Sequence, residues 1–408
     1  MIQAILSRRR LISMPGTTVP YVPHYEPAPV TQETIDWADF PIVDISKAST
    51  AQGRAELAPV VRDAMRTYGF MYVINHGFSQ AQNDRMVDIA DVPFTQVSEE
   101  EKQHFASKIK ETGSYRGFKP REFWVRYPLS LVHFLPLCDD WSDAHGKSDF
   151  VLLLRQTIDN GVRDQIENYN IHHSIFSQPH PKALQPFLSE MRAFAEHNHY
   201  NVLHPILRLL ALGLELPEDA FIDMFDFDAA GETYALFMKY FPRSEEDEVK
   251  TKNVWMKGHA DIGAVSILWS QPVTALQILS PDGKWRYVKH VPNGLIVNIG
   301  DTMEMLSGGF YKATIHRVVQ PPADQRGYPR LGLFYFGYPN DNVKLVPMRG
   351  SPVLQRVGIV RKCADEDAPT MEEMRKARTR SYGRVALKKT ADGHEEEVSG
   401  GVVVKHYN

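Results

Sequence analysis

The sequence predicts an α+β protein with a mainly β core, an antiparallel barrel or jelly roll that follows a largely helical region. Between about residues 234 and 338 the chain consists of short apolar runs such as AVSILW, GLIVNIG and RLGLFYF, separated by turn sequences such as SPDGK, PNG and SGG. Before them, apolar residues recur at helical spacing. Because no helix-length segment separates the later runs, a parallel α/β sheet is disfavoured.

The composition indicates a globular protein with a small-molecule partner. Of 408 residues 43% are hydrophobic, and the formal net charge of -4 comes without a large basic block, which argues against nucleic acid as a partner. The apolar run 206–216 contains Arg208 and is too short to span a bilayer. The two cysteines, Cys138 and Cys363, form no CxxC pair, so an intracellular setting is expected. The oligomeric state stays open.

The amino-terminal half divides into an arm and a mostly helical region. Residues 1–36 are expected to form an extended arm, because 15–29 are rich in proline and aromatics. Its first residues are basic and free of acids, so a mitochondrial presequence is the alternative to a cytoplasmic protein. Within the helical region, 37–232, the patterns predict strands at 39–46 and 70–77 and helices at 54–69, 79–96, 98–105 and 182–216.

The rest of the chain comprises the β core, 233–347, and a tail, 348–408. Residues 113–170 show no sustained hydrophobic period, so no helix or strand is predicted for them. Pro205 predicts an interruption of the long helix over 182–216. In the tail, Thr370 and Glu373 predict a capping box for a helix over 370–383, and a terminal strand is expected after it.

Three side chains in the β core are candidate metal ligands. His259 and Asp261 lie two positions apart in GHADIG, at the expected start of a strand, where both side chains would point to one side. His316 lies in the β-branched run ATIHRVV, which an antiparallel barrel can bring alongside. Two imidazoles and a carboxylate form the facial triad of non-haem Fe(II), although zinc uses the same residue types.

A single cation accompanies these residues. Arg330 begins RLGLFYF, where Arg330, Gly332, Phe334 and Phe336 share one face of the expected strand. A guanidinium on an otherwise aromatic inner face needs an anionic partner, because an unpaired buried charge is very costly. A ligand carboxylate, bound in two places, would provide that partner.

The motifs GHAD, LQIL, NIGDTMEMLSGGFYKATIHRV and RLGLFYF resemble the isopenicillin N synthase-like branch of the Fe(II)/2-oxoglutarate-dependent dioxygenases. PIVDIS, YGFMYVINHG and VSEEEKQHF are similar to the helical region that precedes the barrel in that family, so the resemblance covers roughly 39–345. It implies a double-stranded β-helix and an enzyme of the kind found in secondary metabolism.

The resemblance also implies roles for individual residues. His259, Asp261 and His316 would bind Fe(II), and Arg330 would bind the distal carboxylate of the co-substrate 2-oxoglutarate. With O2, the enzyme would hydroxylate, desaturate or cyclise a small organic molecule and form succinate and CO2. Two hydroxyl groups of the family pattern are missing: Gly332 stands in place of a serine and Phe241 in place of a tyrosine. Tyr240, Lys239 or a water is expected to replace them.

The substrate residues are harder to predict. Phe336 matches a pocket-lining position of the family, and Phe334 shares its face. The aromatic segment 114–124 suggests a lid over the barrel, with Phe118 and Arg121 as substrate contacts, or a loop cemented to the core. Two other functions stay open: an isopenicillin N synthase-like oxidase that does not use 2-oxoglutarate, and a catalytically silent jelly roll that binds small carboxylates.

Several other polar or sulfur-containing residues are assigned structural roles. His197 and His204 are expected on the polar side of the long helix rather than at a metal. Asn298 and Asp301 are expected to support the barrel turn or the metal ligands. Met303 and Met305 alternate at strand spacing and are expected to fill the core.

Overall fold

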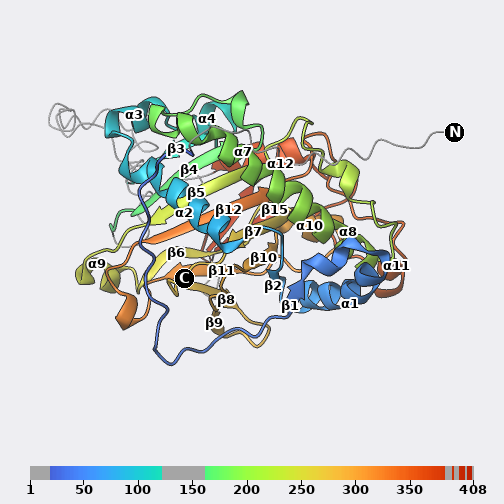
Figure 1. Cartoon of the computed structure of the whole chain (residues 1–408). Coiled ribbons are helices and arrows are strands. Elements are labelled where there is room, and N and C mark those ends of the chain that lie inside the picture. The colour runs from blue at the N-terminus through green and yellow to red at the C-terminus, as the bar shows by residue number, and fades with distance from the viewer. Residues whose placement is uncertain (1–18, 122–160, 382–387, 390–394, 400–401, 407–408) are drawn as a thin grey trace, which may run out of the picture.

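The computed structural model describes residues 19–121, 161–381, 388–389, 395–399 and 402–406, and its largest feature is an eight-stranded sheet (Figure 1). All neighbouring strands in it are antiparallel except the outermost pair, β1 and β2, which are parallel. In spatial order the strands are β1 (Ile42–Asp44), β2 (Phe70–Ile74), β10 (Leu295–Ile299), β7 (Val265–Trp269), β12 (Arg330–Gly337), β5 (Tyr234–Tyr240), β4 (Ile166–His172) and β3 (Gly117–Lys119).

A second, four-stranded antiparallel sheet faces the first. Its strands are β6 (Val254–His259), β11 (His316–Val319), β8 (Leu276–Leu279) and β9 (Trp285–Tyr287). One cavity is lined by residues from both sheets, so the sheets enclose it. This arrangement confirms the predicted jelly roll with a mainly β core. A third, small sheet near the carboxyl end comprises β13 (Lys388–Lys389), β14 (Glu395–Ser399) and β15 (Val402–His406).

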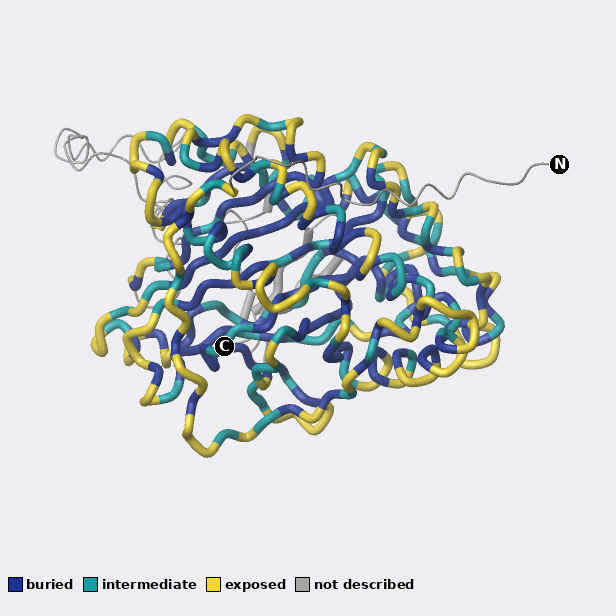
Figure 2. Tube along the Cα trace, in the orientation of Figure 1, coloured by how far each residue is buried: buried dark blue, intermediate teal, exposed yellow. Residues whose placement is uncertain are grey.

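Helices cover the outer face of the large sheet, where α2 packs on β5 and β12 (Figure 1). The α-helices are α1 (Ala51–Thr67), α2 (Gln80–Thr95), α3 (Glu99–His104), α4 (Ile109–Thr112), α7 (Leu188–Glu196), α8 (His204–Gly213), α9 (Glu245–Lys250), α10 (Asp301–Leu306), α11 (Pro352–Val357) and α12 (Met371–Ser381). Shorter helical segments are η1 (Ile45–Ser49), η3 (Ile175–Ser177), η4 (Lys182–Phe187), η5 (His197–Leu203), η6 (Ile222–Met224) and η7 (Ala323–Gln325). The central strands are buried, whereas the helices alternate between buried and exposed residues (Figure 2).

Strand β12 shows how the alternation of side chains separates the two faces of the large sheet. Arg330, Phe334 and Phe336 line the inner cavity, as the sequence predicts. Tyr335 points to the helices, where its hydroxyl lies 2.9 Å from Nδ1 of His199. The inner face therefore serves the cavity, and the outer face serves the helical core.

The predicted helix over 182–216 is divided into four segments, η4, α7, the π-helical η5 and α8. Pro205 lies in the first turn of α8, where its missing N–H costs little. The prediction for His197 is wrong, because its side chain is buried rather than on a polar surface. His204 is half-buried, with Nε2 3.3 Å from the backbone oxygen of Phe225.

The neighbourhood of GHADIG also differs from the prediction. His259 ends β6 instead of starting a strand, and Asp261 lies in the loop between β6 and β7. Met303 and Met305 are buried as expected, but they belong to the helix α10 and not to a strand. A strand therefore ends before the second ligand, and the bend of the loop, not the alternation of a strand, turns Asp261 toward His259.

Strand β4 was not predicted, although its residues do alternate. Asn168 and Asn170 line the cavity, whereas Tyr169 and Ile171 on the other face are fully buried. The alternation covers only residues 168–172, at the end of the region 113–170 that shows no sustained period, and is too short to be distinctive. Strands from both sides of residue 233 thus form one continuous sheet.

Hydrogen bonds of the described residues fix the arm and the start of α12. In the arm, Thr31 Oγ1 donates to Asp324 Oδ1 at 2.7 Å. At α12, the predicted capping box is present: Glu373 N donates to Thr370 Oγ1 at 3.2 Å, and Thr370 N donates to Glu373 Oε2 at 2.8 Å. Gly383, the expected end of this helix, lies outside the described residues. In the described part of the chain, no helix is both long and apolar enough to cross a membrane.

Candidate active site

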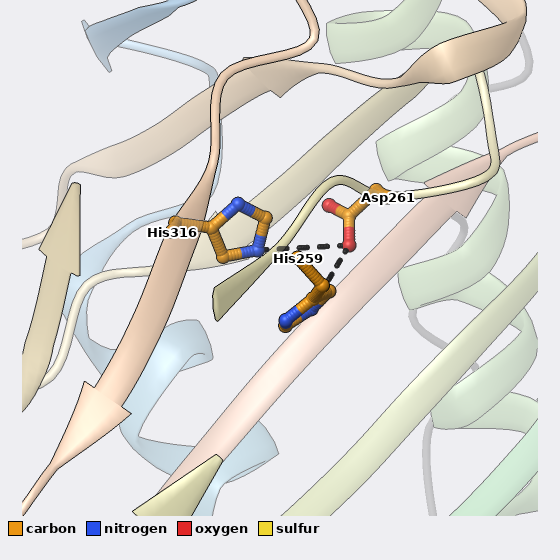
Figure 3. Close-up of side chains that lie close together, drawn as sticks. All are labelled: His259, Asp261 and His316. Atoms are coloured by element: carbon orange, nitrogen blue, oxygen red, sulfur yellow. Dashed lines mark ion pairs between the residues drawn. The ribbon is translucent and has the colours of Figure 1, made fainter. Parts of the chain in front are cut away.

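The three predicted ligands lie together at one end of the cavity (Figure 3). His259 and His316 are direct partners in the register of β6 and β11, and the loop after β6 brings Asp261 beside them. Asp261 Oδ1 lies 3.7 Å from Nε2 of His259 and 3.6 Å from Nε2 of His316. Among the described residues, one ligand atom from each of the three lies within 4.8 Å of the others.

Backbone carbonyls determine which nitrogen of each imidazole faces the centre. Nδ1 of His259 lies 2.8 Å from the oxygen of Lys257, and Nδ1 of His316 lies 3.2 Å from the oxygen of Thr314. A carbonyl can only accept, so each Nδ1 carries the proton. Each Nε2 then has a lone pair directed at the centre of the triad, which is the form in which neutral histidine binds a metal.

The carboxylate of Asp261 is oriented by two donors on its other oxygen. Ser266 Oγ donates to Oδ2 at 2.6 Å, and Asn298 Nδ2 donates to the same oxygen at 2.9 Å. Burial raises the pKa of Asp261, but His316, His259 and these hydrogen bonds outweigh it, and the pKa is lowered overall. Oδ2 is thus occupied by protein donors, and the charged Oδ1 faces the two histidines. Asn298 supports the ligand in the way the sequence predicts.

The first turn of α10 holds the loop that carries Asp261. The backbone N–H of Asp301 donates to the oxygen of Asp261 at 2.7 Å, and Thr302 Oγ1 donates to the oxygen of Ile262 at 2.6 Å. Gly300 permits this approach: a Cβ at this position would lie 2.2 Å from the oxygen of Gly263. The NIGD sequence therefore acts on the site through its backbone as well as through Asn298.

Arg330 lines the same cavity and is only 2% exposed. In the described part of the chain, its Nε and Nη1 are buried and have no hydrogen-bond partner. Its guanidinium lies 5.4 Å from the ring centre of Tyr240. Burial lowers the pKa of Arg330, with Tyr240 and Tyr25 acting in the opposite direction, but an arginine stays charged at neutral pH. A buried cation with unused donors requires an anion from outside the protein.

The surroundings of Arg330 clarify both departures from the family pattern. Tyr240 lies directly opposite Arg330 in the β5–β12 register and lines the cavity, whereas Phe241 is contacted by Arg121 at 4.1 Å from its ring centre. The phenol on this strand is therefore present at Tyr240. Gly332 has no hydroxyl, and a side chain there would not fit, because its Cβ would lie 2.7 Å from the ring of Phe334.

Two of the four predicted substrate residues lie in the cavity and two do not. Phe334 and Phe336 line it, with ring centres 5.7 Å apart. Phe118 is fully buried against Tyr169, 4.4 Å away, on the outer face of β4. Arg121 pairs with Glu167, at 3.3 Å. The expectation that they contact the substrate is thus corrected: β3 places Phe118 against β4, and Arg121, which follows β3, is held by Glu167 of β4. Most of the predicted lid, from residue 122 on, lies outside the described residues.

The cavity is completed by Tyr115, from the aromatic segment 114–124, and by residues that the sequence did not indicate. Its volume is about 370 Å³, and Tyr234, Tyr338, Asn168 and Arg378 also contribute to its lining. Burial raises the pKa values of Tyr234 and Tyr338 well above 10, so both phenols keep their protons at neutral pH. Their positions depend on strand pairing and on the packing of α12, which no local pattern reports.

Two family profiles match the chain. The profile described as the 2OG-Fe(II) oxygenase superfamily matches residues 232–336, and the profile described as non-haem dioxygenase in morphine synthesis N-terminal matches residues 40–125. The first match contains all three triad residues and Arg330. Together they cover most of the β core and the first part of the region before it, and residues 126–231 lie outside both matches.

Similar proteins and solved structures agree with these matches. Mugineic-acid 3-dioxygenase of Hordeum vulgare is 26% identical over 76% of this chain and 76% of its own length. Jasmonate-induced oxygenase 4 of Arabidopsis thaliana is also 26% identical, over 82% of this chain and 84% of its own. A full-length Neurospora crassa protein, crystallised with alpha-KG and thymine, has a TM-score of 0.67 at 20% identity, and the match covers 84% of this chain and 97% of that one. The chain belongs to the Fe(II)/2-oxoglutarate-dependent oxygenases, in their isopenicillin N synthase-like branch.

Proposed function

We propose that this protein oxidises a C–H bond of a small organic molecule, with Fe(II) bound by His259, Asp261 and His316 and 2-oxoglutarate bound by Arg330 and Tyr240. The observation that carries the proposal is the buried Arg330, whose Nε and Nη1 have no partner among the described residues, in the cavity that also contains the triad. The donor set fits Fe(II), since two Nε2 lone pairs and one carboxylate oxygen converge and leave further coordination positions open.

When bound, Fe(II) with 2-oxoglutarate and O2 supplies the oxidising chemistry, and succinate and CO2 are its co-products. The protein supplies the positions of the reactants. Arg330 pairs with the distal carboxylate and so fixes how the co-substrate lies in the cavity. Tyr240 Oη, which has only a weak contact with Met256 Sδ at 3.7 Å, is available as a second donor. The apolar residues of the cavity exclude water from the reacting groups.

We infer that the substrate is small and largely apolar or aromatic. Phe336 lies between Phe334 and Tyr234, with ring centres at 5.7 and 4.9 Å, in an aromatic region beside the triad. The protonated phenols of Tyr234 and Tyr338 add hydrogen-bonding groups that can orient a substrate. A cavity of about 370 Å³ sets an upper limit on substrate size. The similar Neurospora crassa protein was crystallised with thymine, which is a small planar ring, and such a molecule would suit this aromatic region.

The test is anaerobic titration of the protein with Fe(II) and 2-oxoglutarate, followed by O2. A metal-to-ligand charge-transfer band and subsequent succinate formation are expected. His259→Ala and Asp261→Ala should abolish both, whereas the exposed His24→Ala and Asp63→Asn should change neither. Arg330→Met should retain Fe(II) but bind 2-oxoglutarate at least about a hundredfold more weakly.

Other outcomes of this test point to the other two functions. Substrate oxidation without stoichiometric succinate would identify an oxidase that does not use 2-oxoglutarate. Binding of small carboxylates with no O2 consumption, despite bound iron, would identify a silent binder. Succinate formation that survives His259→Ala would contradict the ligand assignment itself.

A further inference from the structure

Asn168 is a second polar side chain in the cavity with an unused hydrogen-bonding atom. It lies in β4, at the far side of β5 from Arg330, and it lines the cavity. Its Oδ1 is buried and has no partner in the described part of the chain. A buried amide atom without a partner costs about 1–3 kcal/mol. An amide oxygen only accepts, but half a turn of the side-chain amide puts Nδ2 in the same place, where it needs an acceptor from a ligand or an ordered water.

The strand register places this amide in the row of Gly332. Asn168 is opposite Met238 in the β4–β5 pair, and Met238 is opposite Gly332 in the β5–β12 pair. The next row of the same three strands contains Tyr240 and Arg330. Neighbouring strands lie about 4.8 Å apart and rows on one face about 6.8 Å, so Asn168 and Arg330, two strands and one row apart on the same face, have Cα atoms roughly 12 Å apart.

Apart from Asn168, the row of Gly332 has no side-chain donor in the cavity lining, because Lys119, its next residue on β3, gives its Nζ to Asp164 and to the oxygen of Ile166. Met238 has none, and the ring of Phe334 occupies the space where a side chain at Gly332 would begin, 2.7 Å from its Cβ position. A hydroxyl cannot enter there while Phe334 keeps its place. The amide of Asn168 is the polar group that this row presents to the cavity from the other side of Met238.

We propose that the side-chain amide of Asn168 donates a hydrogen bond to the distal carboxylate of 2-oxoglutarate, in place of the hydroxyl that is absent at Gly332. The proposal rests on the proposed function. A carboxylate only accepts, so the Nδ2 end of the amide must face it, and half a turn about the last side-chain bond of Asn168 exchanges Nδ2 with Oδ1. Arg330 then supplies the charge, and Asn168 and Tyr240 supply the neutral donors.

The experiment compares two ligands that differ only at the distal carboxylate. Binding of 2-oxoglutarate and of 2-oxopentanoate, which has a methyl group in its place, is measured by anaerobic titration of the Fe(II) protein through the charge-transfer band. Asn168→Ala should weaken 2-oxoglutarate by about tenfold to a hundredfold and leave 2-oxopentanoate unchanged within about twofold. Both ligands chelate the metal identically, so the difference isolates the distal contact.

Two further variants strengthen the comparison. Asn168→Asp keeps the shape of the side chain but places a carboxylate beside the ligand carboxylate, so 2-oxoglutarate should bind even more weakly than to Asn168→Ala. Asn340→Ala is the matched control: Asn340 is also an asparagine, but it does not line the cavity, and its Nδ2 donates to the Asp223 oxygen at 3.2 Å. It should change the affinity for 2-oxoglutarate by less than about twofold.

Equal weakening of both ligands by Asn168→Ala would overturn the proposal, because the amide would then act on the chelate or on the fold. Unchanged binding of both ligands, with altered oxidation of the substrate alone, would also overturn it and assign Asn168 to the substrate. A wild-type protein that gives no charge-transfer band with 2-oxoglutarate would instead refute the proposed function. If Asn168→Ala does not fold, Asn168→Asp alone decides, through its effect on 2-oxoglutarate relative to 2-oxopentanoate.

Discussion

One or two hydrogen bonds orient each ligand side chain of the triad. Carbonyl oxygens bond Nδ1 of His259 and His316, and Ser266 and Asn298 bond Oδ2 of Asp261. In each ligand, the atom that faces the protein is occupied and the atom that faces the centre keeps its lone pair. The site is therefore organised for a cation before any metal arrives.

Asn298 offers a direct test of this organisation. Asn298→Leu removes the donor to Asp261 Oδ2 while keeping the side chain of similar size and buried. The carboxylate should then turn more freely, and the affinity for Fe(II) should fall by about tenfold to a hundredfold. Metal titration measures this, and thermal unfolding without metal checks the fold. An unchanged affinity for Fe(II) would show that Ser266 alone orients Asp261.

Tyr240 shows that a sequence motif does not determine which of two adjacent residues faces the cavity. In MKYFPR, the tyrosine of the family pattern matches Phe241 by its distance from the proline, yet the strand register turns Tyr240 inward, opposite Arg330. Phe241 contacts Arg121 instead. Which of two adjacent residues faces the cavity depends on the pleat of the strand, and a shift of one position exchanges the faces.

Among the elements, α10 has the most direct effect on the site. Only Gly300 separates the end of β10 from the start of α10. The first N–H groups of α10 donate to backbone oxygens of the loop after β6. These N–H groups have no partner inside the helix, so the loop oxygens supply one. The helix and the loop form a single unit, and the position of Asp261 depends on both.

Gly300 tests this unit. In Gly300→Ala, the new methyl group would meet the oxygens of Gly263 and Asp261 at 2.2 and 2.6 Å, so the loop has to move. We expect the free energy of unfolding to fall by about 1–3 kcal/mol and the affinity for Fe(II) to fall with it. Gly350→Ala is the matched control, because a Cβ there meets no atom within 4 Å. Its free energy of unfolding should stay within about 0.5 kcal/mol of wild type.

Urea unfolding and metal titration of the two variants provide the measurement. A Gly300→Ala protein that is destabilised but binds Fe(II) normally would show that the loop is held independently of α10.

At the scale of the whole molecule, three buried histidines remain neutral. Burial lowers the pKa of His172 and His199 to about 3 and that of His197 to about 4, from an ordinary value of 6.5. Nearby histidines add to the effect: His173 on His172, His204 on His199 and His76 on His197. His197 and His199 belong to η5, which packs on β7 and β12, whereas His172 ends β4, where its Nε2 lies 3.0 Å from the oxygen of Gly231.

These lowered pKa values predict acid sensitivity. Below pH 6.5 these histidines are protonated in the unfolded chain but not in the folded protein. The stability that they contribute is therefore complete above pH 6.5 and is lost as the pH falls toward their folded-state pKa values. Near pH 5, unfolding should be accompanied by uptake of up to about three protons, a loss of about 4 kcal/mol per pH unit. Urea unfolding at pH 7, 6 and 5 measures the slope.

A matched variant assigns the slope to individual histidines. His199→Gln should reduce the proton uptake by about one. A stability that does not change between pH 7 and 5 would contradict the prediction.

The sequence by itself determined the β core, most of its strands and the set of residues that meet at the triad. Those features are local. Apolar runs between turns predict strands. The residue types and spacing of His259, Asp261, His316 and Arg330 indicate a metal site with a nearby anion-binding residue. The capping box of α12 is equally local, and it was predicted from Thr370 and Glu373 alone.

Only the tertiary structure decided which side chains complete the cavity. Asn168 lies on the polar face of β4, Tyr240 faces inward because of register, and the pairing of β3 with β4 turns Phe118 away from the cavity. The physical reason is the same in each case. The face that a strand residue presents, and the residues that lie across from it, depend on partners distant in sequence, which local periodicity does not record.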